Sequence, residues 1–133
     1  MKFAVDSSFF IGLFTADQKA KLSKKLFFSL KEKREKVYVP LQAMSEVVEI
    51  LENRFNLDRD VIYDYMIAIL SNYVFYVEKG DLFYRVIELY KKHPSVNIKK
   101  LLIMEESRER QISKILSLDS CFDDLDMTII KKI

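Results

Sequence analysis

The stretch FAVDSSFFI, residues 3–11, decides the fold, because it joins a short apolar run to an aspartate and two hydroxyl residues. Lys2–Val5 has the pattern of a buried strand, and Ser7–Leu13 has the pattern of a helix. Asp6, Ser7 or Ser8 can accept a hydrogen bond from the first amides of that helix. A buried strand that leads straight into a helix is typical of α/β proteins.

The rest of the chain repeats this alternation of short apolar runs and longer helical patterns. Further strands are predicted over Val37–Val39, Tyr73–Val77, Ile112–Leu118 and, at the edge, Met127–Ile130. Further helices are predicted over Asp17–Leu30, over Leu41–Phe55, from Asp58 to about Leu70, from Gly80 to His93, and from about Asn97 to about Arg110. Strands that alternate with helices, without tight hairpin signals, indicate parallel pairing. We expect a three-layer α/β/α domain with a central, mostly parallel sheet of four to five strands.

Length and composition exclude several classes of protein. A chain of 133 residues, half of them hydrophobic, suits one compact domain over residues 1–133. The single cysteine, Cys121, excludes an internal disulfide framework and favours a reducing cytoplasm. No apolar run approaches the ~20 residues that span a membrane, and the N-terminus lacks a signal-peptide pattern. Two glycines cannot build a phosphate-binding glycine loop.

Basic residues crowd one early segment, although the net charge is only +2. The candidates for contact with RNA phosphates are Lys19, Lys21, Lys24 and Lys25, and the same run continues through Lys31, Lys33, Arg34 and Lys36. Such a patch can steer phosphates. The alternative interpretation is a solvated helix face with acidic neighbours such as Glu32 and Glu35.

Three carboxylates are predicted to meet at one edge of the sheet. Asp6 and Asp119 directly follow predicted strands, and Glu46 lies early in the helix after the second strand. In open parallel sheets, functional sites form at the carboxyl ends of the strands. Each residue alone has a simpler interpretation, since Asp6 and Asp119 could cap helices and Glu46 could be solvated.

Clustered carboxylates repel one another unless a cation compensates them. Mg²⁺ or Mn²⁺ suits such oxygen ligands, lowers the pKa of a bound water and neutralises charge on a phosphoryl oxygen. The implied reaction is metal-assisted phosphodiester hydrolysis. No cysteine–histidine spacing predicts a zinc site, and the only histidine, His93, is expected at the surface beside a helix-ending proline.

The order of these segments resembles the PIN-domain family, which includes ribonuclease toxins of toxin–antitoxin pairs and RNA-processing enzymes. The matching pieces are the opening stretch over residues 3–11, Val37–Pro40 followed by Glu46, and Ile115–Phe122 around Asp119. The resemblance implies that Asp6, Glu46 and Asp119 are metal-site acids. It also implies that Ser7, Ser8 and Ser117 are hydroxyls that orient these acids or a bound water.

One position departs from the family pattern. Where the family usually places a further Asp at the start of the helix before the last motif, this chain has Asn97. An amide oxygen can still bind a hard cation, but it adds no charge. Asn97 is equally typical of an ordinary helix cap. Acids that could substitute for the missing charge are Asp81, Glu49, Glu105 and Asp123.

We therefore expect a Mg²⁺- or Mn²⁺-dependent endoribonuclease with Asp6, Glu46 and Asp119 at the metal and Asn97 assisting. The alternative is a catalytically weakened module that binds RNA or a protein. A phosphoacceptor receiver domain is disfavoured, because no lysine lies beside Asp119. The resemblance also implies an antitoxin as partner. Aromatic residues such as Phe9, Phe10, Phe27 and Phe28 could serve that partner or a homodimer, although a place in the core is expected for them.

Overall fold

The computed structural model describes residues 1–16, 18–122 and 125–131. Asp17, where a helix was predicted to begin, and Asp123, a candidate acid, lie outside the described residues. The helices are α1 (Ser7–Phe14), α2 (Ala20–Glu32), α3 (Leu41–Asn53), α4 (Arg59–Ser71), α5 (Gly80–Lys92) and α6 (Ile98–Glu109), with a short 3₁₀ turn η1 (Ser120–Phe122). The strands are β1 (Phe3–Ala4), β2 (Val37–Val39), β3 (Phe75–Val77), β4 (Lys114–Leu116) and β5 (Thr128–Ile130).

All strand pairs are parallel, as the alternating pattern predicts. β1 lies beside β2 with Phe3 opposite Val37, and β2 lies beside β3 with Val37 opposite Phe75. β4 lies beside β5 with Lys114 opposite Thr128. The α/β class is thus confirmed. The expectation of one central sheet is wrong in one respect, because the strands form a three-stranded sheet of order β1-β2-β3 and a separate two-stranded sheet, β4-β5.

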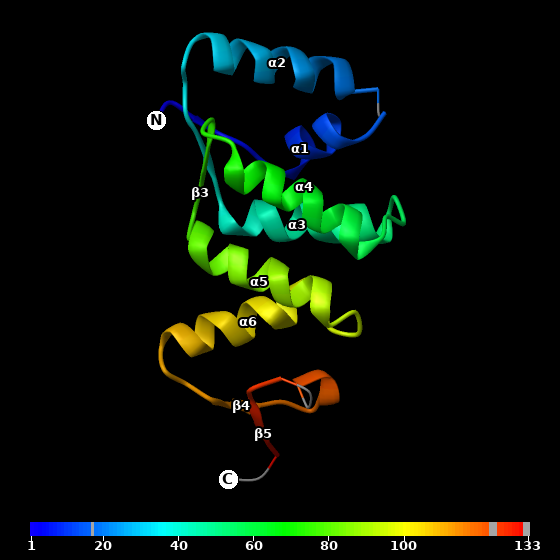
Figure 1. Ribbon diagram of the computed structural model, residues 1–133, viewed down its shortest axis with the longest axis vertical. Helices are drawn as coiled ribbons and strands as arrows, with labels where there is room; N and C mark the ends of the chain where they lie inside the picture. Colours follow the sequence, from blue (N-terminus) through cyan, green and yellow to red (C-terminus); the bar gives the residue numbers. More distant parts are fainter. Residues whose placement is uncertain (17, 123–124, 132–133) are drawn as a thin grey trace.

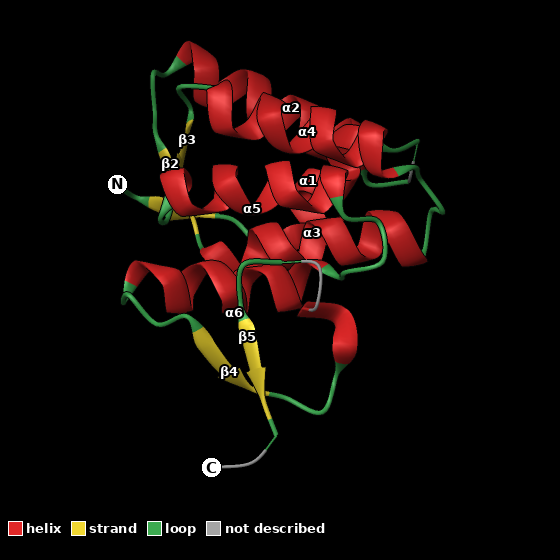
Figure 2. Cartoon of the chain, turned by 60° about the horizontal axis from the view of Figure 1, so that its bottom comes forward, coloured by secondary structure: helices red, strands yellow, loops and turns green. Residues whose placement is uncertain are grey.

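The elements are stacked along the long axis of the molecule (Figure 1). α2 lies at one end and β4-β5 at the other, with α1, α3, α4, α5 and α6 between them. Figure 2, turned by 60°, again shows α6 between β4-β5 and the other helices. α6 therefore separates the two sheets.

The core runs through the helices and the inner strands. Its fully buried side chains include Phe10 of α1, Met44 of α3, Ile62 of α4 and Phe83 of α5. Phe122 and Met127 extend this core to the C-terminal strands, with exposed fractions of 1% and 6%. Burial of large apolar side chains on one stripe of each helix is what holds such layers together.

The first strand is not buried, contrary to the sequence-based expectation. Phe3 is 48% exposed, because β1 is the edge strand of its sheet and β4 does not cover it. The expected core position of the aromatic residues is confirmed for Phe10. It is wrong for Phe28, which is 62% exposed on α2, while Phe9 and Phe27 are half-buried and pack against the core.

Arg59 at the start of α4 organises the far end of α5. One guanidinium nitrogen donates to the carbonyl oxygens of Tyr90, His93 and Val96 at 2.9, 3.1 and 2.8 Å. The guanidinium carbon lies 3.9 Å from the centre of the Tyr90 ring, and another nitrogen lies 3.6 Å from a carboxylate oxygen of Glu52. These bonds give a donor to carbonyls at a helix end and in the following turn, where the His93 carbonyl also accepts from the Val96 amide at 3.1 Å. Among the described helices, none is long and apolar enough to cross a membrane.

Candidate functional site

Asp6 caps α1, and its carboxylate is held by the next turn of chain. Its Oδ1 accepts a hydrogen bond from the Ser8 hydroxyl at 2.6 Å and from the Ser8 amide at 3.1 Å. These donors, with the Ser8 hydroxyl the strongest, lower the pKa of Asp6 below its usual 3.8. Asp6 is therefore charged at neutral pH. The Ser8 hydroxyl therefore fixes the orientation of the Asp6 carboxylate.

Ser7 joins Asp6 to the second predicted acid. Its hydroxyl donates to Oε2 of Glu46 at 3.1 Å, so the start of α1 is tied to the second turn of α3. α3 begins at Leu41, directly after Pro40 ends β2, and this places Glu46 at the carboxyl end of the strands. Two of the three predicted acids are therefore brought to one region by adjacent serines.

Asp119 lies in the turn after β4. Its Oδ1 accepts from the Cys121 amide at 2.9 Å, and Ser117 Oγ accepts from the Asp119 amide at 3.0 Å. The bonds from Cys121, helped by Lys100, lower the pKa of Asp119. Ser117 therefore orients the backbone of Asp119, since its hydroxyl bonds both the amide and the carbonyl of that residue. Burial raises the pKa of the Cys121 thiol, and the neighbouring Asp119 adds to this.

The start of α6 lies between α3 and the turn after β4. Asn97 caps α6 through its Oδ1, which accepts from the Lys100 amide at 2.9 Å. Lys99 Nζ lies 3.3 Å from Glu49 of α3, and Lys100 Nζ lies 3.9 Å from Asp119 Oδ2. Asn97 thus acts as a helix cap in this arrangement. The two lysines neutralise acids that a cation would otherwise compensate.

Sequence reasoning missed Lys99 and Lys100. The signal was available, since both lie in the turn that follows the capping Asn97 and would project from the start of α6. A lysine at the start of a helix is unfavourable, because the helix dipole is positive at that end. Nearby acids can compensate the charge. Their ion pairs with Glu49 and Asp119 supply that compensation.

Asp6, Glu46 and Asp119 do not form a complete metal site in this arrangement. Among residues 1–16, 18–122 and 125–131, no three Asp, Glu, His or Cys side chains gather closely enough to hold a cation. Asp6 precedes Ser7 in the sequence, and Glu46 accepts a hydrogen bond from the Ser7 hydroxyl. Asp119, in contrast, follows β4, which belongs to the other sheet. The oxygen donors suit Mg²⁺ or Mn²⁺ in kind. Asp6 and Glu46 are linked through Ser7, and Asp119 is not gathered with them in the described part of the chain.

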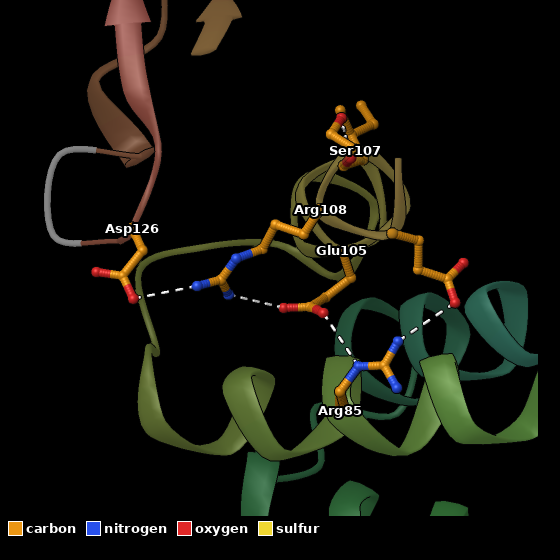
Figure 3. Close-up of polar contacts among 7 residues, drawn as sticks. Arg85, Glu105, Ser107, Arg108 and Asp126 are labelled. Atoms are coloured by element: carbon orange, nitrogen blue, oxygen red, sulfur yellow. Dashed lines mark hydrogen bonds and ion pairs between the residues drawn. The ribbon is translucent and has the colours of Figure 1, made fainter. Parts of the chain in front are cut away.

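Other candidate acids have partners of their own. Glu105 of α6 is buried, with Oε2 at 3.3 Å from Arg85 Nε and Oε1 at 3.0 Å from Arg108 (Figure 3). Arg108 also reaches Asp126 at 3.1 Å, and Arg85 reaches Glu109 at 3.4 Å. This network ties α5, α6 and the approach to β5 together, so Glu105 has a structural role. Asp81 lies in the first turn of α5, exposed to solvent.

The lysines proposed for RNA lie on α2 or just before it. Lys21, Lys24 and Lys25 are exposed on this helix, and Lys19 precedes it. Gly12, near the end of α1, faces Ser23 and Lys19. Because Gly12 is six residues after Asp6, and a helix rises about 1.5 Å per residue, these lysines lie near the end of α1 remote from Asp6. The structure does not gather them around the predicted acids.

A ribonuclease resembles this chain over about two thirds of its length. The VapC ribonuclease of Aquifex aeolicus (strain VF5) is 31% identical over 97 residues, which are 67% of this chain and 72% of that protein. This chain belongs to the VapC family of PIN-domain toxins. No family model matches the chain.

Membership of the VapC family agrees with the resemblance seen in the sequence motifs. It also agrees with the parallel strands and the helix-borne Glu46. The division of the strands into two sheets is the feature that the motif order did not predict.

Proposed function

We propose that this chain is a VapC-type endoribonuclease that hydrolyses RNA phosphodiester bonds as the toxin of a toxin–antitoxin pair. The observation that carries the proposal is the 31% identity to a VapC ribonuclease over two thirds of the chain. The link from Asp6 and Ser8 through Ser7 to Glu46 supports it, because it gathers two carboxyl side chains at one end of the strands.

The proposed activity depends on a divalent metal, Mg²⁺ or Mn²⁺. Asp6, Glu46 and Asp119 would hold it, with Ser7, Ser8 and Ser117 as orienting hydroxyls. Such an ion supplies a water of lowered pKa and neutralises phosphoryl charge. Asp6 is suited to the role, because its lowered pKa keeps it ionised well below neutral pH.

The proposed RNA contacts are Lys19, Lys21, Lys24 and Lys25. Their positive charge near the α1–α2 end of the molecule suits a phosphate backbone, whatever its sequence. Substitution of Lys21, Lys24 and Lys25 by Gln should weaken binding of single-stranded RNA and flatten its dependence on salt. Substitution of Lys91 and Lys92 by Gln, exposed in the last turn of α5, is the control for a loss of positive charge elsewhere on the surface.

Calorimetric titration with Mn²⁺ tests the metal site. The wild type should bind Mn²⁺, and Asp6→Asn and Asp119→Asn should each weaken binding at least tenfold and abolish cleavage of a single-stranded RNA. Asp64→Asn, an exposed acid on α4, is the matched control and should bind as the wild type does. Equal Mn²⁺ affinity in all four proteins would contradict the proposed site.

The alternative function is a weakened module that binds RNA or a protein without cutting. Asn97 favours it, because its amide oxygen brings no charge and already caps α6. Asn97→Asp keeps a good cap and adds the charge. Wild type that binds RNA without cleaving it, combined with cleavage by Asn97→Asp, would support the alternative and assign the defect to this position.

The proposed protein partner is an antitoxin whose amphipathic helix covers an apolar groove. Leu22 and Leu26 are exposed one turn apart on α2. Co-purification with an antitoxin helix should be lost in Leu22→Lys/Leu26→Lys, and a Lys24→Glu/Lys25→Glu variant on the same helix controls for a general effect of surface charge.

A further inference from the structure

An open pocket of about 740 Å³ lies between the end of α1 and the connection from α3 to α4. The rings of Phe14, Phe55 and Tyr65 line it, together with Arg54 and Gln18. In Figure 1, the connections after α1 and after α3 lie on the same side of the molecule. A pocket of this volume is large enough for a small organic group.

The pocket is separate from the predicted acids. Phe14 is eight residues after Asp6, and a helix rises about 1.5 Å per residue, so it lies about 12 Å further along α1. Neither Asp6 nor Glu46 lines the pocket. A ligand held there therefore does not occupy the predicted metal site.

One wall of the pocket is a pair of stacked aromatic rings. The ring centres of Phe14 and Tyr65 are 4.3 Å apart, and the ring planes meet at 11°. Directly after Phe14, Thr15 ends α1, since its amide and its hydroxyl donate to the Ile11 carbonyl at 3.1 and 2.7 Å. This aromatic surface is thus formed before any ligand binds.

A second wall is formed by the end of α3. Asn56 has a φ of 54°, and the Leu57 amide donates to the Leu51 carbonyl at 3.1 Å. This closure through a left-handed residue is typical of helix ends, and it fixes the backbone beside Arg54 and Phe55. A ligand that binds a preformed pocket loses less free energy to the ordering of loops.

Arg54 brings a positive charge to the pocket. Its exposed guanidinium group lies 5.9 Å from the centre of the Phe55 ring, which is longer than the about 3.5–4.0 Å of direct contact. In the described part of the chain, this group joins no ion pair. Its N–H donors are therefore available to phosphate oxygens. On the other side, Gln18 directly precedes Lys19 and the lysines of α2.

These groups suit a nucleotide. Aromatic rings stack with a nucleobase, and a guanidinium group binds phosphate. The Gln18 amide can both donate to and accept from the edge of a base. An apolar ligand would leave Arg54 unused, and inorganic phosphate would leave the three rings unused.

We propose that this pocket holds the base of one unpaired nucleotide of an RNA chain, with Arg54 on its phosphate and the lysines of α2 on neighbouring phosphates. The RNA chain as the source of the nucleotide rests on the proposed function, and the binding of a nucleotide does not. A base held here positions the chain relative to Asp6 and so affects which bond is cleaved.

Fluorescence titration with a short single-stranded RNA tests the pocket. The RNA carries one fluorescent purine analogue whose emission is quenched by stacking, and the buffer contains EDTA, so that binding is measured without a metal. The wild type should quench the emission. Arg54→Gln should weaken binding about tenfold, and Phe55→Leu should weaken it about fivefold or more and lose the quenching.

Matched controls lie away from the pocket. Arg110→Gln removes an exposed arginine at the end of α6, and Tyr73→Leu removes an aromatic ring that is 59% exposed. Both should bind and quench as the wild type does. Absence of quenching by the wild type overturns the proposal, as does an unchanged affinity in both Arg54→Gln and Phe55→Leu.

Free adenosine monophosphate distinguishes the source of the nucleotide. It should bind at least tenfold more weakly than the RNA, because it cannot also reach the lysines of α2. Substitution of Lys21, Lys24 and Lys25 by Gln should weaken binding of the RNA and leave binding of adenosine monophosphate unchanged. Equal affinity of the wild type for the two ligands would overturn the assignment to RNA.

Photocrosslinking of the wild type needs no substitution. Irradiation with an RNA that carries iodouridine should link the base to Phe14, Phe55 or Tyr65, and links only to other residues would overturn the proposal. The outcome is separable from that of the proposed function. Quenching and links at the pocket without RNA cleavage support the pocket and contradict the ribonuclease proposal, and cleavage without either does the reverse.

Discussion

The Ser7 hydroxyl donates to Glu46 at 3.1 Å and so connects the first residue of α1 to α3. The next residue, Ser8, donates to Asp6 on the same turn. Two consecutive serines therefore each orient a different carboxylate. A substitution at Ser7 should therefore affect Glu46, and a substitution at Ser8 should affect Asp6, each without removing the hydrogen bond to the other acid.

Ser8→Ala should raise the pKa of Asp6 toward its usual 3.8, because the hydroxyl is the largest cause of the lowering. Asp6 has a lowered pKa in the folded state, so its contribution to stability is present above the unfolded pKa. That contribution is lost as the pH falls through the folded pKa. Carbon-detected NMR titration of the carboxyl group measures the shift. Ser120→Ala is the control, and an unchanged Asp6 pKa in Ser8→Ala would contradict the assignment.

Gly12→Ala should destabilise the fold by about 1–3 kcal/mol through overpacking. A Cβ at this position would lie 2.1 Å from Ser23 Oγ and 2.9 Å from Ser23 Cβ, so α1 and α2 would have to separate. Thermal and urea denaturation measure the loss. Gly80→Ala is the matched control, since its Cβ would meet no atom closer than 3.8 Å. Equal free energies of unfolding for the two variants would show that α2 can move away from α1 without loss of stability, which contradicts the prediction.

Arg59→Ala should lower the free energy of unfolding by about 2–4 kcal/mol, because three carbonyl oxygens lose the guanidinium bond and, among the described residues, only that of His93 keeps a further donor, the Val96 amide. Urea denaturation measures this. Arg54→Ala, whose exposed guanidinium only lies over the Phe55 ring at 5.9 Å, should change stability by less than about 1 kcal/mol. A loss in Arg54→Ala as large as in Arg59→Ala would contradict the importance given to the carbonyl contacts.

Glu105→Gln should cost about 2 kcal/mol, because it removes a buried charge that compensates both Arg85 and Arg108. Glu109→Gln removes an exposed partner of the same Arg85 and should cost less than about 1 kcal/mol. Denaturation in low and high salt distinguishes them. The Glu105 contribution should persist in high salt, and a contribution that vanishes there would contradict its burial.

Local patterns predicted most elements of this fold. Pro40 and Gly80 mark the starts of α3 and α5, and Asp6 and Asn97 cap α1 and α6. β2 has the predicted bounds, Val37–Val39, whereas the other four strands are shorter than predicted, since only part of each apolar run is paired. Helix starts and caps depend on a few neighbouring residues, and the sequence displays these directly.

The division into two sheets could not be predicted in the same way. Whether β4 lies beside β1 or beside β5 alone depends on where Phe122 and Met127 are buried, far along the chain from β1. The arrangement of the predicted site acids was hard to predict for the same reason. The contacts of Ser7 and Ser8 follow from adjacent residues, whereas the distance from Asp6 to Asp119 depends on strand pairing over more than a hundred positions.

Arg59 has a consequence for how substitutions spread through this molecule. Its guanidinium group binds the carbonyls of the turn between residues 90 and 96. That turn leads into the first turn of α6 and so sets the direction of Asn97, Lys99 and Lys100. A lysine at position 59 would keep the charge but lose the planar, multi-pronged geometry. A substitution at position 59 on α4 therefore changes the positions of side chains at the start of α6, although those residues themselves are unchanged.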